Sequence, residues 1–422
     1  MSENQSKGNV FAIATMFALF FMIAFVTNFA TPMGVIAKNQ FQASNALSQL
    51  GNAANFIAYL FMGIPGGLIL KRKGYKFTAL AAIAVGFAGV GVQLISGYIS
   101  SFAVYVLGAF IAGFSMCMLN LVTNPLLNTL GGGGKKGNQL VQFGCSLNSV
   151  GATLSPAVLG WLIGEITKDT AFIKAAPALM IAMGIFALAF VIVAFSKIPE
   201  PHMETAEEKA ARLSGQTSVM KDIAATLKFR HFTLGALAIF FYIVIEVGVP
   251  AMGFNYMTEV GKPWYVGGAV AGSVCGAYWF LMMCGRLLGG VVGGKISSRV
   301  QVSFLASLGI ALLLAVMFVP VKMITLFGYQ FPLSMAFMVA VGLCTSVMWG
   351  GIFNMAAEGL GKYVPMGSGI FMAMVFGGIL IPVQGLIADK IGILSSYWLS
   401  IGLLAYVLFY ALIGSRVAKA QQ

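Results

Sequence analysis

Residues 10–35 read VFAIATMFALFFMIAFVTNFATPMGV, a run of largely apolar side chains without one charged residue. A helix needs about 20 mostly apolar residues to cross a bilayer, where lipid offers no partner to an unpaired backbone group. The run is longer than the apolar part of a secretory signal, and it lacks a small-residue cleavage site followed by a soluble domain. We therefore expect it to form the first of several transmembrane helices.

Similar apolar runs recur along the 422 residues of the chain. Hydrophobic residues make up 59% of the sequence and charged residues only 9%, whereas soluble domains carry about a quarter charged residues. The bilayer must therefore be the solvent for most of the protein. The sequence predicts an all-α membrane protein with twelve transmembrane helices, at residues 10–35, 47–70, 77–97, 102–126, 139–164, 175–196, 233–257, 264–294, 302–321, 332–357, 367–388 and 392–414.

One long polar segment, residues 197–231, divides these helices into two groups of six. We interpret it as a cytoplasmic linker between an N-terminal half, 1–196, and a C-terminal half, 232–422. Internal similarity supports two pseudo-symmetric halves. The run FFMIAF in the first predicted helix matches FFYIVI in the seventh, and Asn124–Gly131 matches Asn354–Gly361. Transporters built from such repeats bind their substrate near the midplane and alternate access by rocking.

The positive charges predict the orientation of the chain. With the N-terminus inside, 18 of the lysines and arginines fall in cytoplasmic segments and 6 in outer ones, which matches the positive-inside rule. Both termini should then be cytoplasmic. We expect the protein to lie in the inner membrane of a bacterium. The net charge of +13 consequently favours contact with anionic lipid over nucleic acid.

Polar residues within the apolar runs are candidates for the transport site. Glu246 is the one carboxylate in the middle of a predicted span, and such groups usually face a cavity or a partner and can relay protons. The alternative is a protonated glutamate that holds two helices together. Asn120 and Asn124 lie one turn apart on the fourth span, where amides could either bind the hydroxyl groups of a polar solute or join helices.

Two stretches resemble known transporters. Gly67–Lys76, GLILKRKGYK, resembles the loop signature of the major facilitator superfamily, with Lys71 in place of an aspartate and Tyr75 in place of an arginine. Ile352–Gly369, with IFN, EGLGKY and GSG, is similar to the fucose/glucose–galactose/N-acetylglucosamine permeases of that superfamily.

The resemblance implies a sugar cavity that uses Asn28, Asn148 and Trp349. It also implies that Thr31 and Asn120 replace two carboxylates of the fucose branch, so this chain cannot copy that branch's proton coupling. Arg72, in the loop signature, and Arg286 and Glu358, near the inner ends of predicted helices, are interpreted as gating residues.

The sequence therefore predicts a secondary active importer of a hexose or amino sugar, coupled to protons through Glu246 and working as a monomer without cofactor or metal. A sugar uniporter and a metabolite or drug exporter of the same fold are the alternatives. A channel would need a repeated polar ring, which is not evident. An enzyme is disfavoured because the sequence has no HExxH motif and no paired aspartates or histidine in mid-membrane.

Overall fold

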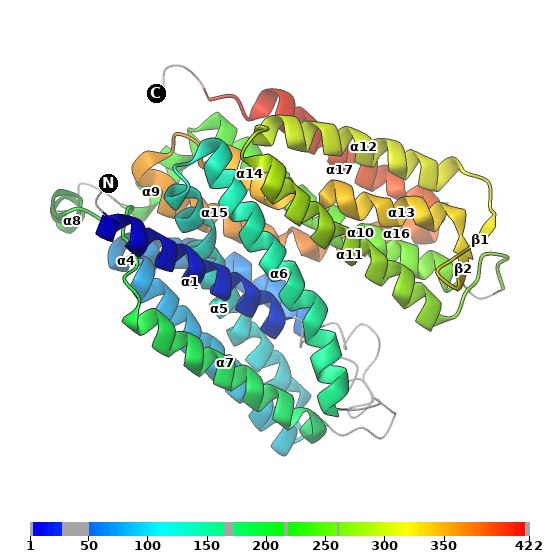
Figure 1. The fold of residues 1–422 in the computed structure, drawn as a ribbon, viewed down its shortest axis with the longest axis horizontal. Helices are drawn as coiled ribbons and strands as arrows, with labels where there is room; N and C mark the ends of the chain where they lie inside the picture. The colour runs from blue at the N-terminus through cyan, green and yellow to red at the C-terminus, as the bar shows by residue number, and fades with distance from the viewer. Residues whose placement is uncertain (1–2, 28–49, 164–171, 215–217, 260, 418–422) are drawn as a thin grey trace. The chain divides into compact units, whose positions relative to one another are not determined.

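The computed structural model describes residues 3–27, 50–163, 172–214, 218–259 and 261–417. Most of them are helical, and the described part of each predicted span overlaps a helix or a set of short helices, which confirms the all-α membrane fold. The long helices are α1 (Glu3–Thr27), α4 (Leu50–Tyr98), α5 (Phe102–Leu130), α6 (Gly134–Ile163), α7 (Ala176–Phe195), α10 (Arg230–Met257), α11 (Gly268–Gly293) and α12 (Ser298–Phe318) (Figure 1).

Several spans differ from simple rods. The second and third form the single element α4, whose one non-helical residue is Gly74, at φ 84° and ψ 177°. The tenth is split at Ser346 and Val347 into α13 (Leu333–Thr345) and α14 (Met348–Ala357). The remaining segments are short: η1 (Phe172–Ala175), α8 (Ala206–Leu213), α9 (Val219–Leu227), η2 (Gly361–Tyr363), α15 (Val364–Ala373), η3 (Met374–Leu380), α16 (Ile381–Ile391), η4 (Leu394–Ser396), α17 (Tyr397–Phe409) and η5 (Tyr410–Gly414).

A β-hairpin that the sequence analysis did not predict connects α12 to α13. Its strands, β1 (Met323–Leu326) and β2 (Tyr329–Pro332), pair antiparallel with Leu326 opposite Tyr329. The two-residue turn has positive φ at both Phe327 (51°) and Gly328 (81°), as a tight hairpin turn requires.

The contacts group the described residues into two compact units. The first comprises those of Met1–Gly132, Leu147–Phe229 and Leu360–Phe376. Here α4 packs along α5, α7 and α15, and Figure 1 shows α4, α5 and α7 side by side. Glycines bring α4 and α15 together, since a Cβ added to Gly63 would lie 2.5 Å from the carbonyl oxygen of Gly369. Small residues permit this approach of two membrane helices.

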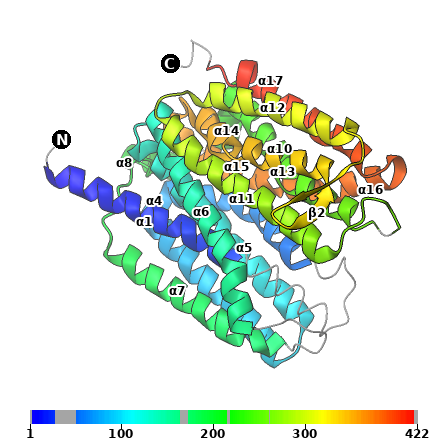
Figure 2. The same ribbon diagram turned by 45° about the vertical axis from the view of Figure 1, so that its right-hand side comes forward.

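The second unit comprises the described residues of Gly133–Ser146, Arg230–Gly359 and Gly377–Gln422. In it α10 packs on α14 and α17, while α12 packs on α13 and α17, and Figure 2 shows α12 beside α17. The first part of α6 also belongs to this unit, because a Cβ on Gly290 of α11 would lie 2.7 Å from the ring of Phe143.

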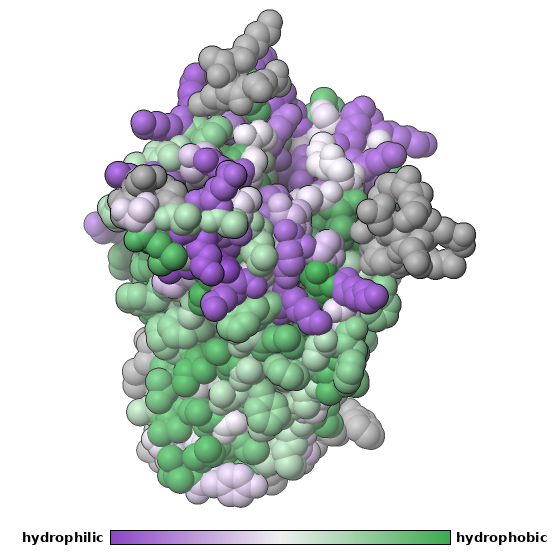
Figure 3. Space-filling model, turned by 90° about the vertical axis from the view of Figure 1, so that its left-hand side faces the viewer, coloured by the Kyte–Doolittle hydropathy of each residue, from purple (hydrophilic) through white to green (hydrophobic). Residues whose placement is uncertain are grey.

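The helices are suited to a bilayer. Within the described residues, nine helical stretches are long and apolar enough to cross a membrane. The longest, Ala53–Tyr98, has 46 residues, about twice what one crossing requires. On the face drawn in Figure 3, apolar side chains cover a broad continuous area and hydrophilic side chains gather at one end. Such a surface is typical of a protein surrounded by lipid.

Candidate functional site

Two opposite charges meet inside the second unit. Nη2 of Arg286, on α11, donates a hydrogen bond to Oε1 of Glu246, on α10, at 3.0 Å. The Arg286 and Glu246 side chains are only 11% and 13% exposed. Breaking such a buried pair from one side costs about 3–5 kcal/mol, because the remaining charge has no compensation. The pair therefore fixes the relative position of α10 and α11.

Aromatic side chains lie around this pair. Tyr242 lies one turn before Glu246 and is fully buried, and its ring centroid is 6.5 Å from that of Trp349. The Tyr278 hydroxyl donates to the backbone oxygen of Glu246 at 3.1 Å. We call these five residues, Tyr242, Glu246, Tyr278, Arg286 and Trp349, the Glu246 cluster. It combines a carboxylate, a guanidinium and aromatic faces, which are the groups that orient and stack on a polar ring.

The break between α13 and α14 positions Trp349. Backbone groups freed by such a break must find other partners in a membrane. Nε2 of Gln142, on α6, donates to the Val347 carbonyl oxygen at 2.9 Å, and the Gly351 amide donates to the same oxygen at 2.9 Å. The Val347 carbonyl at the break therefore has two donors, and Trp349 is the second residue of α14.

The first unit holds a second cluster, made of amides. Nδ2 of Asn120 donates to the Tyr59 hydroxyl and to the Met116 carbonyl, each at 3.0 Å. Nδ2 of Asn124 donates to Oδ1 of Asn120 at 3.2 Å. Both asparagines are buried. We call Tyr59, Asn120 and Asn124 the amide cluster, and its hydrogen bonds favour the helix-joining role as much as sugar binding.

The remaining predicted sugar ligands have different surroundings. Nδ2 of Asn148, on α6, donates to the Phe20 carbonyl of α1 at 3.0 Å, so this half-buried amide joins two helices. Asn28 and Thr31 lie outside the described residues. The roles assigned to Asn28, Asn120, Asn124, Asn148, Glu246 and Trp349 stay predictions.

The residues predicted to gate lie in separate places. Arg286 is in the Glu246 cluster. Glu358 follows α14, and its Oε2 is 3.6 Å from Nη2 of Arg299, which also donates to the Ser415 carbonyl at 2.8 Å. Arg72 is exposed on α4 near Gly74. Their gating role also stays a prediction.

The linker docks on the loop signature at the two positions that depart from the family pattern. Nζ of Lys71 lies 2.8 Å from Oδ2 of Asp222, on α9. The Tyr75 hydroxyl is hydrogen-bonded to Nδ1 of His202 at 2.7 Å. The Glu200 carboxylate accepts hydrogen bonds from the Tyr75 amide and, at 2.9 Å, from the Lys76 amide. We call these contacts the linker clamp.

Burial changes the acid–base behaviour of the linker clamp. It raises the pKa of the Glu200 carboxyl, although the two backbone amides and Lys76 act in the opposite direction. It lowers the pKa of the His202 imidazole. Both shifts have the same cause, because a charged form loses its hydration when it is buried.

Sequence reasoning missed the contact between Glu246 and Arg286. A usable signal was present, because these two opposite charges both lie inside predicted spans. Intramembrane charges usually pair with one another. The linker clamp carried no comparable signal, since its members are far apart in the chain.

Comparisons with known proteins agree with this architecture. The model of the family described as Major Facilitator Superfamily matches residues 13–371. A glucose/galactose transporter of Brucella abortus (strain 2308) is 29% identical over 419 residues, covering 98% of this chain and 97% of the relative. The L-fucose-proton symporter of Escherichia coli (strain K12) is 22% identical over 414 residues, covering 92% and 89%.

Solved structures show the same fold. The crystal structure of the transporter FucP in the outward conformation superposes with a TM-score of 0.81 at 18% identity, covering 97% of this chain and all of the other. The proton:xylose symporter XylE superposes with a TM-score of 0.67 at 15% identity, covering 95% and 94%.

Proposed function

The chain belongs to the Major Facilitator Superfamily, and on that premise we propose that it imports a hexose or amino sugar through a bacterial inner membrane. It would work by alternating access, with both termini in the cytoplasm. The relatives named as glucose/galactose transporters, which match nearly the whole chain, support sugar as the substrate. The superfamily is one of transporters, and an enzymatic function is not proposed.

The observation that carries the proposal is the Glu246 cluster. A sugar ring presents hydroxyls that both donate and accept hydrogen bonds, and an apolar face that stacks on an aromatic side chain. The carboxylate of Glu246 and the guanidinium of Arg286 can bind the sugar hydroxyls. The half-buried Trp349 can stack on the apolar face of the sugar ring. We also propose Asn28, Asn120, Asn124 and Asn148 as sugar ligands, on the resemblance described above.

We further propose that Glu246 couples sugar movement to a proton. In the closed pair its negative charge is held by Arg286 at 3.0 Å. A proton on Glu246 would remove the attraction and free the guanidinium for a sugar hydroxyl, so proton and sugar would bind together. Release of the proton would restore the pair and weaken sugar binding, as symport requires.

Uptake into proteoliposomes tests both parts. Purified protein is reconstituted, and uptake of labelled glucose, galactose, fucose and N-acetylglucosamine is measured with and without an inward proton gradient. We expect accumulation of at least one sugar only with the gradient. Glu246→Gln keeps the shape of the side chain but cannot release a proton, so it should abolish accumulation and leave exchange between equal pools intact.

Glu259→Gln is the matched control, because Glu259 lies just beyond the same helix and forms only a solvent-exposed pair with Lys262 in the described structure. Accumulation that survives in Glu246→Gln would exclude Glu246 as the coupling group. Equal uptake with and without the gradient would favour the uniporter. Absence of transport of every sugar, with efflux of apolar compounds, would favour the exporter.

A further inference from the structure

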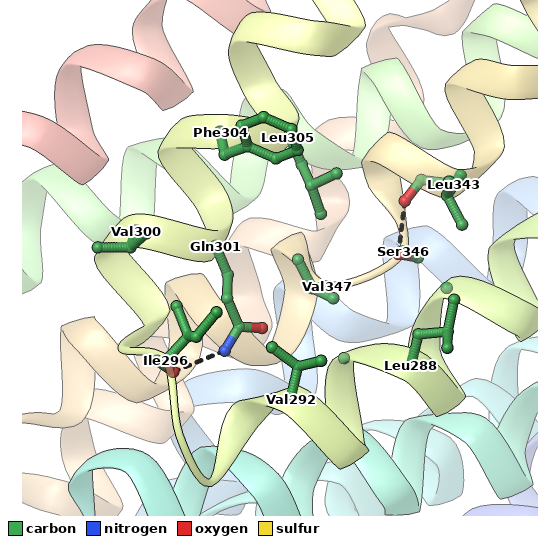
Figure 4. A pocket seen from close by; sticks show the side chains of 12 residues that line it. Leu288, Val292, Ile296, Val300, Gln301, Phe304, Leu305, Leu343, Ser346 and Val347 are labelled. Carbon is green, nitrogen blue, oxygen red and sulfur yellow. Dashed lines mark hydrogen bonds between the residues drawn. The ribbon is translucent and has the colours of Figure 1, made fainter.

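An apolar pocket of about 260 Å³ opens in the second unit. Figure 4 shows Leu288 and Val292 of α11 on one side, Val300 and Phe304 of α12 on another, and Val347 at the helix break. Each wall comes from a membrane-spanning helix or its end, so the pocket is part of the transmembrane region.

The pocket offers its occupant almost no free hydrogen-bonding group. Its two polar side chains are already used internally: Nε2 of Gln301 donates to the Ile296 carbonyl at 2.8 Å, and Oγ of Ser346 donates to the Leu343 carbonyl at 2.6 Å, as the dashed lines in Figure 4 show. A sugar would lose its hydrogen bonds to water there without replacement. The pocket therefore fits an apolar chain.

The pocket opens to the outside of the unit. Leu288, Val300 and Phe304 are 59%, 57% and 66% exposed, although all three are large and apolar. In a membrane-spanning helix such side chains face the acyl chains of lipid. An occupant can consequently enter sideways from the bilayer, without crossing the protein.

Basic residues lie beside one end of the pocket. Lys295 directly precedes Ile296, a wall residue, and is exposed. The start of α6 reaches the same turn, since a Cβ on Gly294 would lie 2.9 Å from Oε1 of Gln139. One turn before Gln139, α6 carries the exposed Lys135 and Lys136.

We propose that this pocket is a binding site for an anionic phospholipid. One acyl chain fills the apolar space between α11 and α12, and the phosphate lies against Lys295, Lys135 and Lys136. Juxtamembrane lysines attract anionic head groups, and a membrane-facing apolar pocket retains the chain. The combination distinguishes one site from the lipids that surround any membrane protein.

Photolabelling tests the acyl-chain part. The protein is reconstituted with trace phosphatidylglycerol that carries a diazirine in one acyl chain, irradiated, and digested for mass spectrometry. We expect labels concentrated in the segments 285–305 and 343–347. Val292→Trp, which fills the pocket, should remove most of them. Val291→Trp, at the adjacent but non-lining and 62% exposed position, should leave them in place.

Charge substitutions test the head-group part. Replacing Lys135, Lys136 and Lys295 together by Gln should lower labelling at the pocket by about fivefold for each lysine. The control replaces Lys73, Lys209 and Lys228, three exposed lysines of the first unit, by Gln. Labelling spread evenly over all helices, insensitivity to Val292→Trp, or equal labelling by a phosphatidylcholine probe would each overturn the proposal.

Discussion

At the scale of single residues, Glu246 and Arg286 depend on one another. Each charge inside a bilayer costs about 2.5–3.5 kcal/mol on insertion scales, and their contact at 3.0 Å offsets much of that cost. Neither residue can therefore be understood from its own substitution alone, because removing one leaves the other uncompensated.

A double-mutant cycle makes this dependence measurable. We expect Arg286→Ala to lower the free energy of unfolding by about 3–5 kcal/mol, because Glu246 would be left buried and charged. Glu246→Gln in the Arg286→Ala background should restore part of the loss. Thermal unfolding of the four proteins in detergent measures the coupling, and equal midpoints for Arg286→Ala and the double variant would contradict a structural ion pair.

The sequence predicted which residues are polar inside the membrane but not what they contact. Glu246 stands out because it lies between apolar residues in the chain, where a carboxylate is costly to place in the membrane. That cost can be recognised from the linear sequence alone. The partners of Asn148 and Asn120, by contrast, depend on how α6 meets α1 and how α5 meets α4. Those contacts are set by packing between distant segments, which local composition does not encode.

At the scale of elements, helix positions were predictable and helix interruptions were not. A span is marked by some twenty apolar residues, a signal summed over its whole length. At the break at Ser346 and Val347, the side-chain donor to the Val347 carbonyl is Gln142, more than 200 residues away in the chain. The β1–β2 hairpin was missed because it is short and lies between two strong helical signals.

The linker clamp should respond to pH. Because burial lowers the pKa of His202 below its ordinary 6.5, the folded protein binds fewer protons there than the unfolded chain. The stabilising contribution is therefore present above pH 6.5 and is lost as the pH falls through the lowered value. We expect hydrogen exchange at the amides of Glu200, His202, Met203 and Glu204, corrected for intrinsic rates, to become faster as the pH falls from about 7.5 to 5.5.

His202→Gln is the comparison for that experiment, since it keeps a polar contact to Tyr75 without titrating. Glu200 shifts in the opposite sense, because its pKa is raised and its charge therefore costs stability as the pH rises above 4.5. Glu200 is unchanged in the variant, so any difference between the two profiles belongs to His202. Identical profiles would show that His202 does not control the linker clamp.

The crossing of α4 and α15 depends on the absence of side chains. A Cβ at residue 369 would lie 2.6 Å from the carbonyl oxygen of Gly63, and overpacking of this kind costs about 1–3 kcal/mol. Gly369→Ala should therefore lower the midpoint of thermal unfolding. Gly402→Ala on α17, where the described structure has nothing within 4 Å of the added atom, should leave it unchanged or raise it.

At the scale of the whole molecule, the charge distribution sets the orientation that we propose. In a chain with its five cysteines replaced, Lys209→Cys on α8 and Phe327→Cys in the hairpin turn report on opposite sides of the membrane. Both positions are exposed, Phe327 at 91%. We expect a membrane-impermeant maleimide to label residue 327 in intact cells and residue 209 only after permeabilisation. The reverse pattern would invert the predicted topology.

The linker clamp also limits how this protein can be recombined with others. Lys71 and Tyr75 stand where the family pattern has an aspartate and an arginine, and they contact Asp222 and His202. A chimaera whose linker lacked counterparts of Asp222 and His202 would lose both partners at once, and one that received a loop with an aspartate in place of Lys71 would place it against Asp222. The loop and the linker therefore behave as one exchangeable part, although Lys71 and Asp222 are about 150 residues apart in the chain. A working hybrid must take both segments from the same parent.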